Sequence, residues 1–260
     1  MEPAIATGCV SSERIAEAVH LGVRSGVRGF LVHANQWLAD SDESTAPEIN
    51  FTGADFFGFY DALSGSGNSL FGAESQRSYG CKRLRVLCED AHRQGGRLII
   101  LGGLGAREME VRATTSEIHA RLADFFDGVI PVFESRRITL VLDVPEVRDD
   151  ATRLCLSGVG EITRFLGYYR HPLLRIGLRA SELEMQSFSD ETFLEKILPQ
   201  LSVVIFDNLL PPHKGAMQTI TRLVRYGYKG IVLLGIGNRT SEGITGLSRE
   251  LEKFKELIQA

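Results

Sequence analysis

The sequence predicts an α/β fold, and within that class a single (β/α)8 TIM barrel over residues 1–260. Three observations favour it. Apolar runs of strand length alternate with stretches of helical periodicity along the whole chain, as in parallel sheets with helical crossovers. About eight strand–helix units can be counted, the number that closes such a barrel. The 260 residues also match the length of roughly 250 that is typical of this fold. A doubly wound open sheet is the alternative.

The predicted strands are apolar runs rich in Val, Ile, Leu and Phe, and several end in Gly or Asp. In chain order they begin at Pro3, Gly29, Ala54, Arg97, Ile138, Leu173, Leu201 and Gly230. Near-continuous apolar strands are typical of sheets buried on both faces, and therefore of parallel sheets. The first run is weak, and the run Ala54–Tyr60 is also compatible with a helix.

The intervening stretches predict helices, because apolar residues recur in them at helical spacing. The stripes are Ile15 and Val19; Leu84, Leu87, Cys88 and Ala91; Ile118, Leu122 and Phe125; Ile162, Phe165 and Leu166; Phe193, Ile197 and Leu198; Ile220, Leu223 and Val224; and Leu247, Leu251, Phe254 and Ile258. Loops are expected at Asp40–Pro47 and Leu63–Gly72. Neither a linker nor an internal repeat justifies a division into domains.

Composition and charge exclude several classes of protein. The chain has 29 Lys and Arg against 33 Asp and Glu, a net charge of -4, and 43% hydrophobic residues, which is ordinary for a soluble globular protein. The chain has no excess of basic residues, so we expect no nucleic-acid partner. No apolar run reaches the roughly 18–20 residues of a membrane span, so we expect no membrane partner. The expected partner is a small-molecule substrate, and assembly into a homo-oligomer is left open.

The four cysteines indicate a reducing compartment. No pair among Cys9, Cys81, Cys88 and Cys155 has the C-x-x-C spacing of zinc or redox sites. The N-terminus lacks the basic and apolar regions of a secretory signal. We therefore expect a cytoplasmic protein with reduced thiols that pack in the core.

Candidate site residues follow the predicted strands, because the active site of a TIM barrel lies at the carboxyl ends of its strands. Leu174, Ile176 and Leu178 suit the outer face of their strand, which directs Arg179 into the barrel. The same alternation directs Asp143 inward. Asp207 and Asn208 end the next strand, and the pattern does not decide which of them points inward.

Further polar candidates lie near the same edge. His33 and Asn35 follow the second strand; His33 is a candidate general base, with a structural, hydrogen-bonded histidine as the alternative. Glu146 and Glu182 lie just beyond strand ends. They are candidate acids or bases, with solvated loop carboxylates as the alternative. Gly237, Asn238 and Arg239 follow the last strand, where barrels often bind phosphate; a simple tight turn is the alternative.

Several segments resemble the xylose-isomerase-like TIM barrels, the superfamily of sugar phosphate isomerases and epimerases. Ser12–Ala18 followed by Gly26–Phe30 is similar to the first helix and second strand of that family. Arg83–Ala91 followed by Gly95–Gly103 resembles its third helix and fourth strand, and Gly227–Gly235 its approach to the last strand. The resemblance implies a sugar isomerase or epimerase.

The resemblance also implies a divalent metal, and here the sequence departs from it. The family typically binds the metal with Glu, Asp, His and Glu from the second half of the barrel. Asp143 stands at about the first ligand position, but Arg179, Ala180 and Ser181 stand where an Asp is expected. Val204 or Ile205 replaces the His, and Gly235 replaces the final Glu. We therefore expect neither a catalytic metal nor another cofactor.

Two functions remain open from the sequence. The first is a metal-independent isomerase, epimerase or lyase that moves a proton on a small polyhydroxylated or carbonyl substrate. Asp143 or Asp207 would be the base, and Arg179, flanked by these carboxylates, would stabilise an anionic oxygen. The second is a non-catalytic barrel that lost its metal and acts as a binding or complex-forming subunit.

Overall fold

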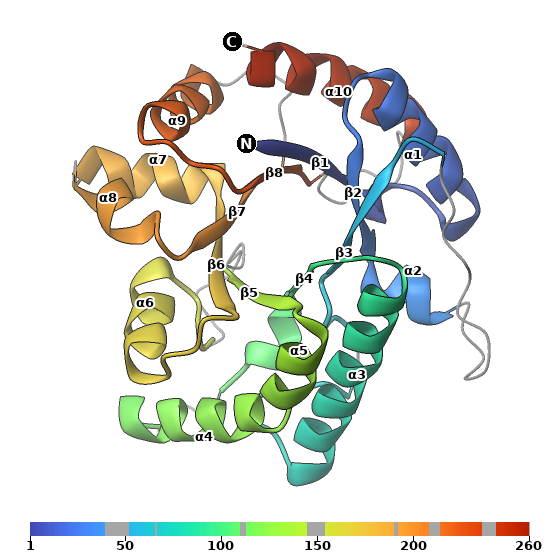
Figure 1. Ribbon diagram of the computed structural model, residues 1–260. Helices are drawn as coiled ribbons and strands as arrows, with labels where there is room; N and C mark the ends of the chain where they lie inside the picture. Colours follow the sequence, from blue (N-terminus) through green and yellow to red (C-terminus); the bar gives the residue numbers. More distant parts are fainter. Residues whose placement is uncertain are drawn as a thin grey trace.

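Eight parallel strands close into a barrel in chain order. The structure, a computed structural model, describes residues 1–39, 52–65, 67–109, 113–144, 154–189, 192–207, 214–235 and 243–259. The pairing of β1 with β8 closes the sheet, so the predicted TIM barrel is confirmed and the open sheet is wrong. The strands, which form the central ring of Figure 1, are β1 (Glu2–Ala6), β2 (Gly29–His33), β3 (Asp55–Tyr60), β4 (Leu98–Ile100), β5 (Thr139–Asp143), β6 (Leu174–Arg179), β7 (Leu201–Phe206) and β8 (Ile231–Leu234).

Helices surround this ring (Figure 1). They are α1 (Ile15–Arg24), α2 (Ala34–Ala39), α3 (Glu74–Arg93), α4 (Thr115–Asp127), α5 (Ile130–Arg136), α6 (Val159–Tyr168), α7 (Ala180–Ser189), α8 (Phe193–Ile197), α9 (Lys214–Arg225) and α10 (Gly243–Gln259). Three short 3₁₀ helices follow strand ends or precede α1: η1 (Thr7–Cys9), η2 (Ser12–Arg14) and η3 (Leu104–Arg107). In the described part of the chain, no helix combines the length and the apolar character that crossing a membrane requires.

Among the described residues, α1, α3, α4, α6, α8, α9 and α10 form where apolar stripes predicted helices, whereas α2, α5 and α7 were not predicted. Leu84, Leu87 and Cys88 are buried on α3, and the helix gives way to Gly95, whose φ of 77° favours glycine. Thr114 accepts a hydrogen bond from the N–H of Glu117 and so caps α4. The predicted stripe is wrong at Val224, which lies on the outer face of α9 and is 59% exposed. A periodic pattern alone does not place the edge of a helix stripe.

Two apolar layers hold the barrel together. Side chains inside the barrel form one cluster, made of Ala4, Ala6, Leu31, Phe57, Leu98, Ile100, Val141, Val203, Ile205, Ile231 and Leu233. The second and larger cluster lies between the sheet and the helices. Leu174, Ile176 and Leu178 belong to it, which confirms the predicted outward face of β6. The barrel is therefore a packed core, and polar groups are left to its ends.

An arginine packs on the inner cluster at the amino end of the barrel. The Arg97 guanidinium lies 4.0 Å from the centre of the Phe57 ring, a cation–π contact. The same guanidinium forms an ion pair with Glu2. In TIM barrels the active site lies at the opposite end, where the strands finish.

Gly58 permits an irregularity in β3 that a side chain would break. The β2–β3 register shifts between Phe30 and Leu31, and Gly58 has a φ of 140°. A Cβ at Gly58 would overlap the carbonyl of Leu98 on β4. We expect Gly58→Ala to lower the free energy of unfolding by about 1–3 kcal/mol through backbone strain alone. The collision with Leu98 lowers it further. Urea unfolding measures the loss, and Gly160→Ala, where a Cβ meets open space, is the matched control. Equal stability of the two variants would contradict this explanation.

Candidate active site

The carboxyl ends of the strands direct several polar side chains into the mouth of the barrel. In the sheet, Arg179 pairs with Ile205, and Ile205 belongs to the inner cluster. Paired residues on neighbouring strands share a face, so Arg179 points inward, as predicted. Asp143 follows the inward Val141 at the same spacing, and Asp207 follows Ile205. This alternation places Asp207 on the inner face; Asn208 lies outside the described residues.

Arg179 and Asp207 form an ion pair at the mouth of the barrel. The two side chains are 22% and 29% exposed, so water or a ligand reaches them from the open end. A guanidinium presents several N–H donors in a planar fork, and the ion pair with Asp207 holds that fork at the mouth. The pair therefore brings a hydrogen-bond donor and a proton acceptor together on adjacent strands.

Asp143 has a different partner from the one expected. Its Oδ1 accepts a hydrogen bond from Nη2 of Arg107 at 2.6 Å and from the N–H of Gly102 at 2.8 Å. Only 9% of the Asp143 side chain is exposed, and Arg107 is completely buried. The expectation that Asp143 balances Arg179 is corrected, because the ion-pair partner of Asp143 is Arg107. Sequence reasoning missed Arg107: it comes five residues after a predicted strand end, and nothing in its neighbourhood separates it from a surface arginine.

Arg107 also ties two loops together above the barrel. Its Nη1 donates to the carbonyl oxygens of Asp143 at 2.7 Å and Leu156 at 3.2 Å, and its Nε donates to Gly102 at 3.1 Å. Its own carbonyl accepts from the N–H of Cys155 at 2.9 Å. Burial raises the pKa of the Cys155 thiol, so this cysteine is a neutral packing group. One buried cation thus joins the loop after β4 to residues that follow β5.

The glycines after β4 bind carboxylates of the protein itself. Gly102 donates to Asp143, and the N–H of Gly103 donates to Oδ1 of Asp61 at 2.6 Å. Both glycines have a positive φ, and a Cβ at Gly102 would overlap Asp61. The backbone of this loop therefore lies close to two carboxylates, those of Asp143 and Asp61. Glycines allow such a close approach of N–H groups to an anion.

His33 forms a pair with Asp61, a residue that sequence reasoning missed. His33 Nε2 lies 3.1 Å from Oδ2 of Asp61, and Nδ1 accepts the N–H of Asn35 at 3.1 Å. Since Nδ1 is an acceptor, the proton of the neutral ring is on Nε2 and is donated to Asp61. The side chain of Asn35 accepts from Arg83 at 2.6 Å. The histidine and the asparagine are thus held in a network at the β2–β3 side of the mouth.

Asp61 makes stability depend on pH in the acid range. Burial disfavours the charged form of Asp61, but hydrogen bonds from His33 and from the N–H of Gly103 outweigh it and hold its pKa below the usual value of 3.8. A depressed folded-state pKa contributes stability above the unfolded pKa, and that stability is lost as pH falls through the folded value. We expect Asp61→Asn to flatten the loss of stability below about pH 4. Urea unfolding from pH 7 to pH 2 measures it; parallel curves for both proteins would contradict it.

The remaining candidates are placed less centrally. Glu182 lies in the first turn of α7, half-exposed. Glu146, Gly237, Asn238 and Arg239 lie outside the described residues. Tyr60, on the inner face of β3, was not among the predicted site residues. Its hydroxyl packs over Gly8, where a Cβ would collide with it. Its ring contacts the ring of His33 edge-on.

These residues do not fit the divalent metal that the fold implies. A hard cation needs several oxygen ligands with free lone pairs. Asp143 and Asp207 each have a guanidinium as partner. The inward positions of the neighbouring strands carry Ile205 and Gly235, which offer no side-chain ligand. In the part of the chain that the structure describes, no group of three His, Cys, Asp or Glu side chains is arranged to hold a metal.

Comparisons with known proteins agree with this fold. No protein-family model and no curated protein matches the sequence. Solved structures match over the whole chain. They include a 3-keto-D-glucoside 4-epimerase, YcjR, from E. coli (14% identity, 100% of both chains, TM-score 0.79) and a D-psicose 3-epimerase from Clostridium cellulolyticum H10 with D-tagatose (13% identity, 100% of this chain and 96% of the other, TM-score 0.72). A xylose isomerase domain protein from Alicyclobacillus acidocaldarius subsp. acidocaldarius matches at 17% identity, 100% of both chains and a TM-score of 0.67. The fold is therefore that of the xylose-isomerase-like TIM barrels, as the resemblance predicted.

Proposed function

We propose that this protein is a sugar isomerase or epimerase that transfers a proton next to a carbonyl group without a tightly bound divalent metal. The observation that carries the proposal is the partly exposed Arg179–Asp207 pair at the mouth of the barrel. In this fold the activity resides at that end. A guanidinium beside a carboxylate supplies both an electrostatic stabiliser and a base, the two groups that enolisation needs.

The two residues take different steps of the reaction. Asp207 removes the proton from the carbon next to the carbonyl, and the C–H electron pair forms the C=C bond of an enolate. The displaced carbonyl electrons remain on oxygen, where Arg179 stabilises them through charged hydrogen bonds. An isomerisation is completed when Asp207 returns the proton to the former carbonyl carbon and the hydroxyl proton moves from one enediolate oxygen to the other. An epimerisation is completed when water protonates the original carbon from the opposite face and Asp207 releases its proton to solvent. Loss of a leaving group from the same enolate would give a lyase.

Asp143 takes a supporting role in this proposal. Its carboxylate is bound by Arg107 and Gly102 and almost fully buried, so it is a poor proton acceptor. Asp207 is therefore the preferred base of the two carboxylates considered from the sequence. The substrate class rests on the comparisons: the similar structures include proteins named as epimerases of sugars and keto sugars, which supports a small polyhydroxylated carbonyl compound.

Solvent deuterium exchange tests the proposal without knowledge of the product. The protein is incubated in D2O with D-fructose, D-tagatose, L-ribulose or a 3-keto-D-glucoside, with a chelator present. We expect deuterium at the carbon next to the carbonyl of at least one sugar, lost in Asp207→Asn and kept in the exposed control Glu195→Gln. Absence of exchange with every sugar, with or without added metal, would overturn it.

A non-catalytic barrel is the second candidate, and one observation favours it. Asp143 and both ring nitrogens of His33 already have partners within the protein. Calorimetric titration with the same sugars separates the two functions: binding with no exchange identifies a binding protein, whereas exchange identifies an enzyme.

A further inference from the structure

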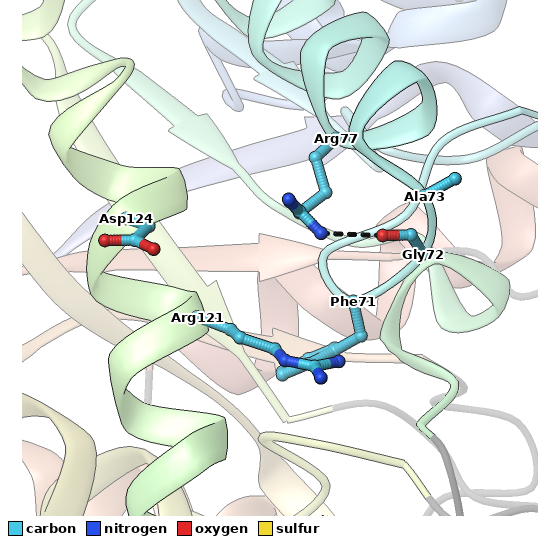
Figure 2. A pocket seen from close by; sticks show the side chains of 6 residues that line it. All are labelled: Phe71, Gly72, Ala73, Arg77, Arg121 and Asp124. Atoms are coloured by element: carbon cyan, nitrogen blue, oxygen red, sulfur yellow. Dashed lines mark hydrogen bonds between the residues drawn. The ribbon is translucent and has the colours of Figure 1, made fainter.

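A second hollow lies outside the barrel mouth, between the start of α3 and the side of α4. It has a volume of about 570 Å³ and is lined by Phe71, Gly72, Ala73, Arg77, Arg121 and Asp124 (Figure 2). A smaller depression of about 340 Å³ adjoins it and shares Arg77 and Asp124. None of these residues belongs to the candidate active site.

Two arginines enter this hollow from opposite walls. Arg77, on α3, donates from Nη1 to the carbonyl oxygen of Gly72 at 2.8 Å, which holds its guanidinium over the hollow and leaves its other N–H groups for a ligand (Figure 2). Arg121, on α4, extends from the facing wall toward Phe71. Among the described residues, the Arg121 side chain has neither an ion pair nor a hydrogen bond, although the charge of Glu117 on the same helix acts on it. Two guanidinium groups that face one space repel each other, and an anion between them removes that cost.

Charge in the surrounding wall decides which ligand suits the hollow. Asp124 is the single acidic residue of the lining, and it forms no ion pair with either arginine in the described part of the chain. The adjoining depression adds Arg85 and Glu74. The arginines nearest the cavity thus exceed its acid by one charge. Their forks of N–H donors match the tetrahedral oxygens of phosphate.

We infer that this hollow binds a phosphate group of a small molecule, at a site separate from the barrel mouth. Arg77 is the fixed contact and Arg121 closes on the anion from α4. Asp124 opposes an anion, so it limits the affinity.

Titration with inorganic phosphate and with D-fructose 6-phosphate at constant ionic strength tests the inference, read by calorimetry. We expect Arg121→Met and Arg77→Met each to weaken binding about tenfold or more, since charged hydrogen bonds are worth about 1.5–3 kcal/mol. Asp124→Asn should tighten binding, and the exposed control Arg164→Met should leave it unchanged.

The mouth of the barrel provides the decisive comparison. Arg179→Met should leave phosphate binding intact, because Arg179 belongs to the other site. Loss of binding in Arg179→Met with retention in Arg77→Met and Arg121→Met would assign the anion to the mouth and overturn the inference. Failure of the parent protein to bind either compound would overturn it as well. None of these outcomes depends on the proposed isomerase activity.

Discussion

Replacement of Arg107 by methionine should lower the free energy of unfolding by about 3–5 kcal/mol, because removing one partner of a buried ion pair leaves the other charge uncompensated. Arg107 is fully buried, and it bonds to the carboxylate of Asp143 and to three carbonyl groups. Urea unfolding measures the loss, with Arg164→Met, on the exposed face of α6, as the matched control.

A double variant separates the ion pair from the other contacts of Arg107. In Arg107→Met with Asp143→Leu, no carboxylate is left buried without its cation, so part of the lost stability should return. The stability that the double variant does not recover measures the hydrogen bonds from Arg107 to the loops at Gly102 and Leu156. An Arg107→Met protein as stable as the control would contradict the assignment of Arg107 as the buried link between these loops.

Arg179→Met should reduce turnover by about 10²–10³-fold, as the loss of one preorganised oxyanion stabiliser typically does. Arg179→Lys keeps the charge without the planar fork, so it should fall between the parent and the methionine variant. Deuterium exchange, with whichever of the four test sugars the parent protein labels, measures turnover, and thermal melts report stability separately. Because Arg179 is partly exposed, we expect little change in the melting temperature. A methionine variant that melts much lower, with a lysine variant of full activity, would make Arg179 a structural residue.

The fold could be predicted from the sequence because its signal is local. Eight apolar runs became eight strands, including Asp55–Tyr60, for which a helix was also considered. The inward direction of Arg179 followed from alternation along a single strand. The helices α2, α5 and α7 were not predicted. Both α2 and α7 begin directly after a strand, β2 and β6, so no loop in the sequence marks where they start.

The partners within the site could not be predicted, because they come from distant parts of the chain. Asp143 and Arg107 are 36 residues apart, and His33 and Asp61 are 28 apart. Alternation fixes the face on which a side chain lies, but not which loop reaches it. Arg107 enters the site from a 3₁₀ helix after β4, and no sequence pattern marks that direction. The pairing of Asp143 was therefore assigned to the wrong arginine.

Metal content of the purified protein tests the central claim, that arginines neutralise the carboxylates with which this fold would hold a divalent cation. Elemental analysis of the parent protein and of Asp143→Asn is combined with deuterium exchange before and after chelation. We expect well under one equivalent of Mn, Zn, Mg or Co per chain, and activity that survives chelation. One equivalent of metal in the parent, lost in Asp143→Asn together with the activity, would contradict it.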